Sequence, residues 1–312
     1  MVVLVTGANG QLGQAIQSIS GKYPEIDFVF CSSSDLDITN LENCQVVFDE
    51  FQPHFCINTA AYTAVDKAES ESSKAFDINA NGPENLAITC KKFNTILIHI
   101  STDFVFDAYF SDGIAYYDRE LRLPLKSNLG LTETDVPFPS GVYGLTKLQG
   151  EQAIQANWEK HFIIRTSWVY SQFGNNFMKT MLRLASERDS LSVVADQIGT
   201  PTNAVDLAEV LIVIMVSSFK FASPVRFHSG QVSSFGIYNF SNEGQCSWYD
   251  FANEIFRQKG VSIDLKPIPT SAYPTPAKRP AYSVLDKTKI KSTFDIKIND
   301  WQTSLSACLK QL

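Results

Sequence analysis

A tyrosine and a lysine lie four residues apart in the segment VYGLTKLQGE, at Tyr143 and Lys147. Four residues make about one helical turn, so the two side chains would stack on one face of a helix. A phenol loses its proton at about pH 10, and a neighbouring ammonium group lowers that pKa. The spacing therefore suits a tuned proton donor, although two ordinary surface residues can share it.

A polar triplet, Ser101 to Asp103, stands at the end of the apolar run TILIHIS, Thr95–Ser101. The run predicts a buried strand, and parallel sheets bind ligands beyond the carboxyl ends of their strands. Thr102 and Asp103 are therefore candidate site residues.

Three glycines, Gly7, Gly10 and Gly13, lie between a predicted strand at Val2–Thr6 and a predicted helix at Gln11–Ile19. Glycines at this spacing permit a tight turn, close approach of a pyrophosphate and close helix–strand packing. The free N–H groups at the helix N-terminus favour an anion. The segment predicts a dinucleotide-binding turn.

Cofactor preference is less clear from the second predicted strand, Asp27–Cys31, which ends in CSSSDLD. An acid at such a tip binds the ribose 2′-OH, and a basic group accepts a 2′-phosphate. The tip has no arginine and no acid before Asp35, so we expect NADPH to bind at least as well as NADH. Asp37 lies within reach of the adenine edge, or it forms a loop turn.

Strands and helices alternate along the first half of the chain. Further strands are expected at His54–Ala60 and His161–Ser167, and helices at Ser73–Phe93 and Thr146–Trp158. This order predicts an α/β fold with a doubly wound parallel sheet. After about Ser167 the order loosens, with helices expected at Asn175–Glu187, Val205–Ser217, Ser247–Gly260 and Asn299–Leu309 and a proline-rich loop at Pro267–Pro280.

The composition excludes several classes of protein. The 312 residues carry a net charge of −7 and no long run of one sign, which argues against nucleic-acid and anionic-membrane partners. The six scattered cysteines predict free thiols in a reducing cytoplasm, without a disulfide framework or zinc site. We expect no signal peptide, and the apolar run at Val210–Val216 is too short to span a bilayer.

Together these motifs resemble a known family. TGxxGxxG, STD and YGxTK are similar to motifs of the extended short-chain dehydrogenase/reductases. The blocks AAYTAVDKAE, STDFVF, VYGLTKLQGE, RTSWVY, GNNFMKTMLRLA, DQIGTPT and YPTPAKRP narrow the resemblance to the dTDP-4-dehydrorhamnose reductase family. They span the chain from Gly7 to Pro280 in the expected order.

The resemblance implies a Rossmann-type domain at residues 1–170 and about 204–240, and a smaller α/β lobe that binds a sugar nucleotide at about 171–203 and 241–312. It implies reduction of a C4 keto group, with Tyr143 as the proton donor and Lys147 holding the nicotinamide ribose and lowering the pKa of Tyr143. Thr102 would bind the same sugar oxygen. The implied cofactor residues are Gly7, Gly10, Gln11, Leu12, Gly13, Asp37, Ile38, Ala61, Tyr62, Thr63, Tyr143 and Lys147. The implied substrate residues are Thr102, Asp103, Trp168 and Arg279.

Two features depart from the family pattern. The segment between Asp107 and Tyr143 is about fifteen residues longer than expected, which exceeds an ordinary loop. Some family members bind magnesium at a dimer interface through a glutamate early in the first helix. Ala15 stands in the matching region here, which leaves both magnesium and a homodimer open.

Two alternatives remain beside the reductase. One is a sugar-nucleotide epimerase or dehydratase of the same superfamily. A dehydratase needs an acid after Asp103, where this chain has Phe104. The other is a non-catalytic regulatory subunit with the reductase fold, against which the intact Thr102, Tyr143 and Lys147 argue.

Overall fold

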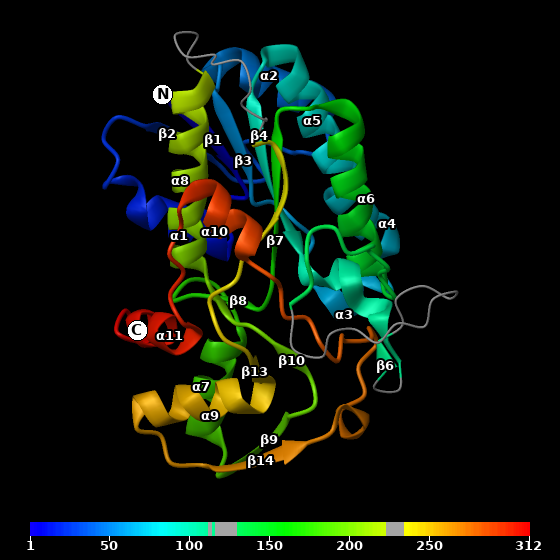
Figure 1. Cartoon of the computed structure of the whole chain (residues 1–312), viewed down its shortest axis with the longest axis vertical. Helices are drawn as coiled ribbons and strands as arrows, with labels where there is room; N and C mark the ends of the chain where they lie inside the picture. The colour runs from blue at the N-terminus through cyan, green and yellow to red at the C-terminus, as the bar shows by residue number, and fades with distance from the viewer. Residues whose placement is uncertain (112–113, 116–129, 223–233) are drawn as a thin grey trace.

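A six-stranded parallel sheet forms the centre of the larger lobe in the computed structural model of the chain (Figure 1). The structure describes residues 1–111, 114–115, 130–222 and 234–312. The strands lie in the order β12-β7-β4-β3-β1-β2, and every neighbouring pair is parallel. Their bounds are β1 Val2–Thr6, β2 Asp27–Cys31, β3 Phe55–Asn58, β4 Ile96–Thr102, β7 His161–Thr166 and β12 Gly236–Asn239. This confirms the predicted doubly wound α/β fold.

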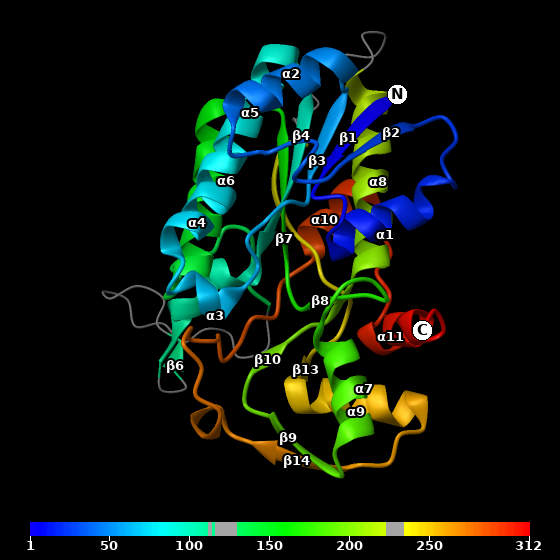
Figure 2. The ribbon, with the colours of Figure 1, turned by 180° about the vertical axis from the view of Figure 1, so that it is seen from behind.

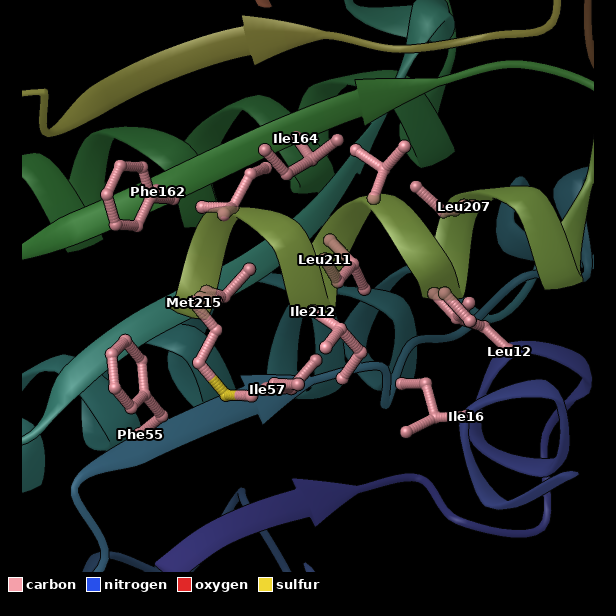
Figure 3. Packing of buried hydrophobic residues seen from close by; sticks show 14 of the residues in the cluster. Leu12, Ile16, Phe55, Ile57, Phe162, Ile164, Leu207, Leu211, Ile212 and Met215 are labelled. Carbon is pink, nitrogen blue, oxygen red and sulfur yellow. The ribbon is translucent and has the colours of Figure 1, made fainter. Parts of the chain in front are cut away.

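Three helices cover one face of the sheet: α1 (Gln11–Ser20), α8 (Ala204–Ala222) and α10 (Thr288–Phe294). Figure 3 shows Leu211 and Met215 of α8 among the side chains of the strands, with Leu12 and Ile16 of α1 beside them. The apolar run Val210–Val216 was judged from the sequence to be too short to span a bilayer. It lies in α8 and is part of this core. Across the described residues, no helix is both long and apolar enough to cross a membrane.

Three other helices cover the opposite face: α2 (Leu41–Phe51), α5 (Gly82–Phe93) and α6 (Val142–Asn157) (Figure 2). Between β3 and α5 lie the short helices α3 (Val65–Ala68) and α4 (Ser72–Phe76) and one π-helical turn at Asp77–Asn81. The helix expected at Ser73–Phe93 is therefore present, with a π-helical turn within it. Pro83 follows this turn, at the start of α5.

The smaller lobe has its own apolar core, made by α7 (Phe177–Glu187), α9 (Trp248–Lys259), α11 (Trp301–Leu309) and the parallel pair β9 (Ser190–Val194) and β14 (Asp264–Ile268). Short two-stranded pairs join the lobes: β8 (Val169–Tyr170) with β11 (Thr202–Asn203), and β10 (Ile198–Gly199) with β13 (Cys246–Ser247). A 3-10 helix at Thr270–Ala272 lies in the proline-rich loop.

Several elements differ from the sequence-based expectations. Helix α6 begins at Val142, four residues before the expected start, so Tyr143 lies inside the helix. Strand β12 and helices α2 and α10 were not foreseen. Helix α10 packs against α8 and β12, within the larger lobe, so residues 288–294 do not follow the predicted domain boundaries.

The segment after β4 continues as a 3-10 helix at Asp103–Tyr109 and the hairpin strands β5 (Phe110–Ser111) and β6 (Ile114–Ala115). Residues 112–113 and 116–129 of the unusually long segment between Asp107 and Tyr143 lie outside the described residues.

Candidate functional site

A cavity of about 660 Å³ opens beyond the carboxyl ends of the central strands. The chain turns in opposite directions from β1 and β3, and a doubly wound sheet binds its ligand at this switch point. The structure brings eleven of the predicted site residues to the cavity wall: Gly10, Gln11, Leu12, Ala61, Thr63, Thr102, Asp103, Tyr143, Lys147, Trp168 and Arg279. They come from segments spread over most of the chain, which is the arrangement that a cofactor and substrate site requires.

The glycine-rich turn fits a dinucleotide. Gly7 adopts a φ of +66°, and a Cβ atom there would lie 2.7 Å from the backbone nitrogen of Ala60. A Cβ atom on Gly13 would lie 2.5 Å from the Gly7 carbonyl oxygen. Helix α1 begins after Gly10, which makes no side-chain cap, so its first N–H groups remain available to an anion. Gly7 and Gly13 lie beneath the turn and do not line the cavity.

An acidic side chain, Asp35, lies at the tip of β2. The Asp35 carboxylate folds back and accepts hydrogen bonds from the Ser32 N–H (2.8 Å) and hydroxyl (2.6 Å). These bonds hold the pKa of Asp35 below its usual value. Asp35, the first acid after β2 in the sequence, is thus returned to the strand end by a short turn.

Three predicted cofactor residues lie away from the cavity wall. The Asp37 carboxylate accepts from the N–H and hydroxyl of Thr39 and so builds the turn before α2. Ile38 is buried in the core, and the Tyr62 hydroxyl donates to Glu71. For Asp37 the structure favours the loop-turn reading, and contacts from these three residues to a cofactor stay predictions.

Thr102, Asp103 and Tyr143 meet at the floor of the cavity. The Thr102 hydroxyl donates to Asp103 Oδ1 at 3.1 Å and accepts from the Phe104 N–H at 3.2 Å. The Phe104 ring stands edge-on to Tyr143, with 5.5 Å between the ring centroids. Burial raises the pKa of Tyr143 to about 12, and a hydrogen bond with Thr102 only partly offsets this effect. Tyr143 therefore keeps its proton at neutral pH, as a general acid must.

Lys147 is 1% exposed, and its side-chain nitrogen forms hydrogen bonds with groups of β4 in the central sheet. Its Nζ donates to the Ile100 carbonyl oxygen at 2.7 Å and lies 3.1 Å from His99 Nε2. Burial lowers the pKa of Lys147 to about 8, against the opposing effect of the Glu151 charge. The expected lowering of the pKa of Tyr143 by Lys147 is absent from this arrangement, because desolvation of the phenol dominates.

A second cavity of about 790 Å³ adjoins the first and shares Gln197, Trp248 and Arg279 with it. Arg188 and Arg279 supply positive charge to its wall. The Arg279 guanidinium also holds the Asp66 carboxylate in two bonds of 2.8 and 2.7 Å, which keeps the pKa of Asp66 below its usual value. The two cavities together form one cleft, and Arg279 lies on the walls of both.

An indole pair lines the cleft, with Trp168 on the wall of the first cavity and Trp248 on the walls of both. Trp168 and Trp248 stack with 3.6 Å between centroids and 10° between planes. Trp168 has a φ of +47°, which is rare for a bulky residue, and its ring lies where a side chain on Gly199 would stand. The sequence analysis singled out Trp168 and missed Trp248, whose place at the start of α9 gave no sign of a site.

Ala15 is fully buried, and within the described ranges no cluster of three or more potential metal ligands occurs. All six cysteines are buried and free, as the sequence predicted.

Comparison with known proteins agrees with this geometry. A relative from Aggregatibacter actinomycetemcomitans, named dTDP-4-dehydrorhamnose reductase, is 41% identical over 312 residues, which cover 97% of this chain and 96% of the relative.

Two solved structures with the same name cover the whole chain. The one from Clostridium acetobutylicum is 39% identical, with a TM-score of 0.85, and covers 100% of this chain and 99% of that chain. The one from Bacillus anthracis, solved in complex with NADP, is 36% identical, with a TM-score of 0.84 and the same coverage. The family model described as RmlD substrate binding domain matches residues 1–312, and the chain belongs to this family.

Proposed function

We propose that the protein reduces the C4 keto group of dTDP-4-dehydro-6-deoxy-L-mannose to give dTDP-L-rhamnose, with NADPH as the reductant. One observation carries the proposal: a single cleft joins a glycine-rich turn to Thr102, Tyr143 and Lys147. The names of the full-length relatives supply the substrate, and the NADP complex of one of them favours NADPH.

The turn around Gly10 would hold the pyrophosphate, with Ala61 and Thr63 beside the rest of the dinucleotide. The bound cofactor supplies a hydride to the keto carbon. Tyr143 then donates its proton to the oxygen, which gains negative charge as the carbonyl is reduced. Thr102 binds the same oxygen and orients it.

The sugar would lie against Trp168, between the two cavities, and the nucleotide would extend into the second cavity. Arg279 is placed to bind the diphosphate, because a guanidinium group matches two phosphate oxygens at once. Asp103, with its carboxylate buried beside Thr102, would contact the sugar.

The experiment incubates the purified protein with dTDP-4-dehydro-6-deoxy-L-mannose and either NADPH or NADH, and follows the absorbance of the reduced nicotinamide. Substrate-dependent oxidation that disappears in Tyr143→Phe supports the proposal. A protein that binds the sugar nucleotide without oxidising either cofactor would instead be the regulatory subunit. Turnover of UDP-glucose without net oxidation would identify an epimerase.

A further inference from the structure

A buried line of hydrogen bonds runs beneath the cleft from β1 to α6. The Thr6 hydroxyl donates to Asn58 Oδ1 at 2.6 Å, and Asn58 Nδ2 lies 2.9 Å from His99 Nδ1. The other ring nitrogen, His99 Nε2, lies 3.1 Å from Lys147 Nζ. Thr6, Asn58, His99 and Lys147 are all at most 1% exposed, so water does not compete for these bonds.

A backbone partner identifies the orientation of the Asn58 amide in this structure. Asn58 Oδ1 accepts a second hydrogen bond, at 3.1 Å, from the N–H of Ala60. A backbone N–H can only donate, so the atom that faces it must be the amide oxygen. The amide nitrogen therefore faces His99.

That orientation fixes the proton on His99. An amide nitrogen can only donate, so His99 Nδ1 must accept and carries no proton. Neutral imidazole then has its proton on Nε2, directed at Lys147. If Lys147 were an ammonium group, two N–H donors would face each other and no hydrogen bond could form between them. An amine accepts the imidazole N–H through its lone pair, while one of its own N–H groups donates to the Ile100 carbonyl oxygen.

We propose that His99 is a positioning residue whose tautomer is coupled to the charge on Lys147. With the His99 proton on Nε2, Lys147 is the uncharged amine. When Lys147 takes a proton from solvent, the His99 proton must reside on Nδ1, and the Asn58 amide must turn to accept it. One proton is gained in total, and it resides on the lysine.

The neighbouring charges make this exchange accessible. Burial and the Lys147 charge hold the pKa of His99 well below its usual value, and His161 on β7 acts in the same direction, so the ring stays neutral. Glu151, one turn from Lys147 on α6, favours the ammonium form. Its own charge is largely engaged by Arg165 on β7, at 2.6 Å, and by the Ser101 hydroxyl. Tyr143 faces Lys147 from the preceding turn of α6 and is uncharged at neutral pH.

The exchange also reaches the glycine-rich turn. A turned Asn58 amide leaves the Ala60 N–H without its acceptor, and Ala60 is the residue against which Gly7 is packed. The loop after β3 and Lys147 are thus linked through one imidazole ring, whichever sugar nucleotide the enzyme reduces.

Nitrogen NMR of the histidine rings tests the proposal directly on the full-length protein without added cofactor. The chain has four histidines, and the spectrum of His99→Gln identifies the His99 signals. Above the titration of Lys147, His99 should carry its proton on Nε2, and the proton should shift to Nδ1 as the pH falls through that titration. A proton on Nδ1 at every pH, or a charged ring, would overturn the proposal.

Asn58→Asp provides a second test. A carboxylate only accepts, so it should retain the bonds from Thr6 and Ala60 and lock the His99 proton on Nδ1 at every pH. The pKa of Lys147, read from its own NMR signal, should rise by about one unit or more. The added charge alone also raises that pKa, so the His99 tautomer is the deciding readout.

Asn40→Asp is the matched control. Asn40 is an exposed N-cap that accepts from the Asn43 N–H, and aspartate serves equally well there. Asn40→Asp should leave both the His99 tautomer and the pKa of Lys147 unchanged. If Asn58→Asp folds and His99 keeps its proton on Nε2, the coupling is refuted. If the variant does not fold, the wild-type tautomer decides alone.

Discussion

Replacing Arg279 by alanine should weaken binding of the sugar nucleotide and leave the cofactor unaffected. The guanidinium borders both cavities and is 24% exposed, while its partner Asp66 is 40% exposed. An ion pair this accessible contributes about 0.2–1 kcal/mol. A charge-assisted hydrogen bond to a diphosphate contributes about 1.5–3 kcal/mol. The diphosphate therefore competes successfully with Asp66 for the guanidinium.

These magnitudes set the expected kinetics. Arg279→Ala should raise the KM for the sugar nucleotide about ten- to a hundredfold, since about 1.4 kcal/mol corresponds to a factor of ten. Asp66→Asn should act in the opposite direction and lower that KM by up to about fivefold, because the competing ion pair of at most about 1 kcal/mol is removed. Arg279→Lys should fall between wild type and alanine, since an ammonium group cannot bind bidentately.

The assay is steady-state oxidation of NADPH over a range of sugar-nucleotide concentrations, with the Kd for NADPH measured separately by fluorescence titration. Arg183→Ala is the control, because Arg183 is an exposed arginine of α7 paired with Glu187 and outside both cavity walls. An unchanged sugar-nucleotide KM in Arg279→Ala would refute the reasoning. So would a loss of NADPH affinity, because Arg279 would then belong to the cofactor site.

Four further predictions concern single residues. Tyr143→Phe should fold normally, as judged by circular dichroism, and lose about two to four orders of magnitude in turnover; retention of half the activity would rule out its role as the acid. Burial lowers the pKa of Lys147 from its ordinary 10.5 to about 8 in the folded chain, so the unfolded chain binds more protons between these pH values and stability should rise with pH there. Urea unfolding should show that rise in wild type and not in Lys147→Met. Gly7→Ala should lose about 1–3 kcal/mol of stability and most NADPH binding. Gly10→Ala should unfold at nearly the wild-type urea concentration, because its Cβ would stand 3.2 Å from its nearest neighbour. Asp35→Asn should raise the ratio of NADPH to NADH affinity, because it removes a negative charge from the tip of β2; an unchanged ratio in competition titrations would place the ribose elsewhere.

The parts of the fold that sequence predicted are those governed by local chemistry. The β-branched run at Val2–Thr6 and the glycines after it gave β1 and the turn at the correct residues. The helix expected at Ser247–Gly260 is α9, which begins after the Ser247 cap and ends at Gly260 in a left-handed conformation. Strand β12 was missed because four residues at a sheet edge carry little periodic signal, and their place depends on pairing with β7.

In the candidate site, too, the residues set by local sequence were predicted and those set by contacts between distant segments were missed. Tyr143 and Lys147 were found because one helix fixes their spacing, and the structure confirms that helix. Trp248 and Asp66 were missed because their role depends on contacts between distant segments. His99 was read as one more residue of an apolar strand, since nothing in the sequence reveals that it faces Lys147.

The stack of Trp168 and Trp248 links the two lobes, because one indole follows the last residues of β7 and the other begins α9. A hinge movement that widens the cleft must slide or separate the two rings. Only two other tryptophans occur in the chain, Trp158 and Trp301, and both are buried in the cores. Trp158 and Trp301 stay within their cores when the cleft opens, so a change in intrinsic fluorescence on opening would come mainly from this stack and would report the movement without any attached label.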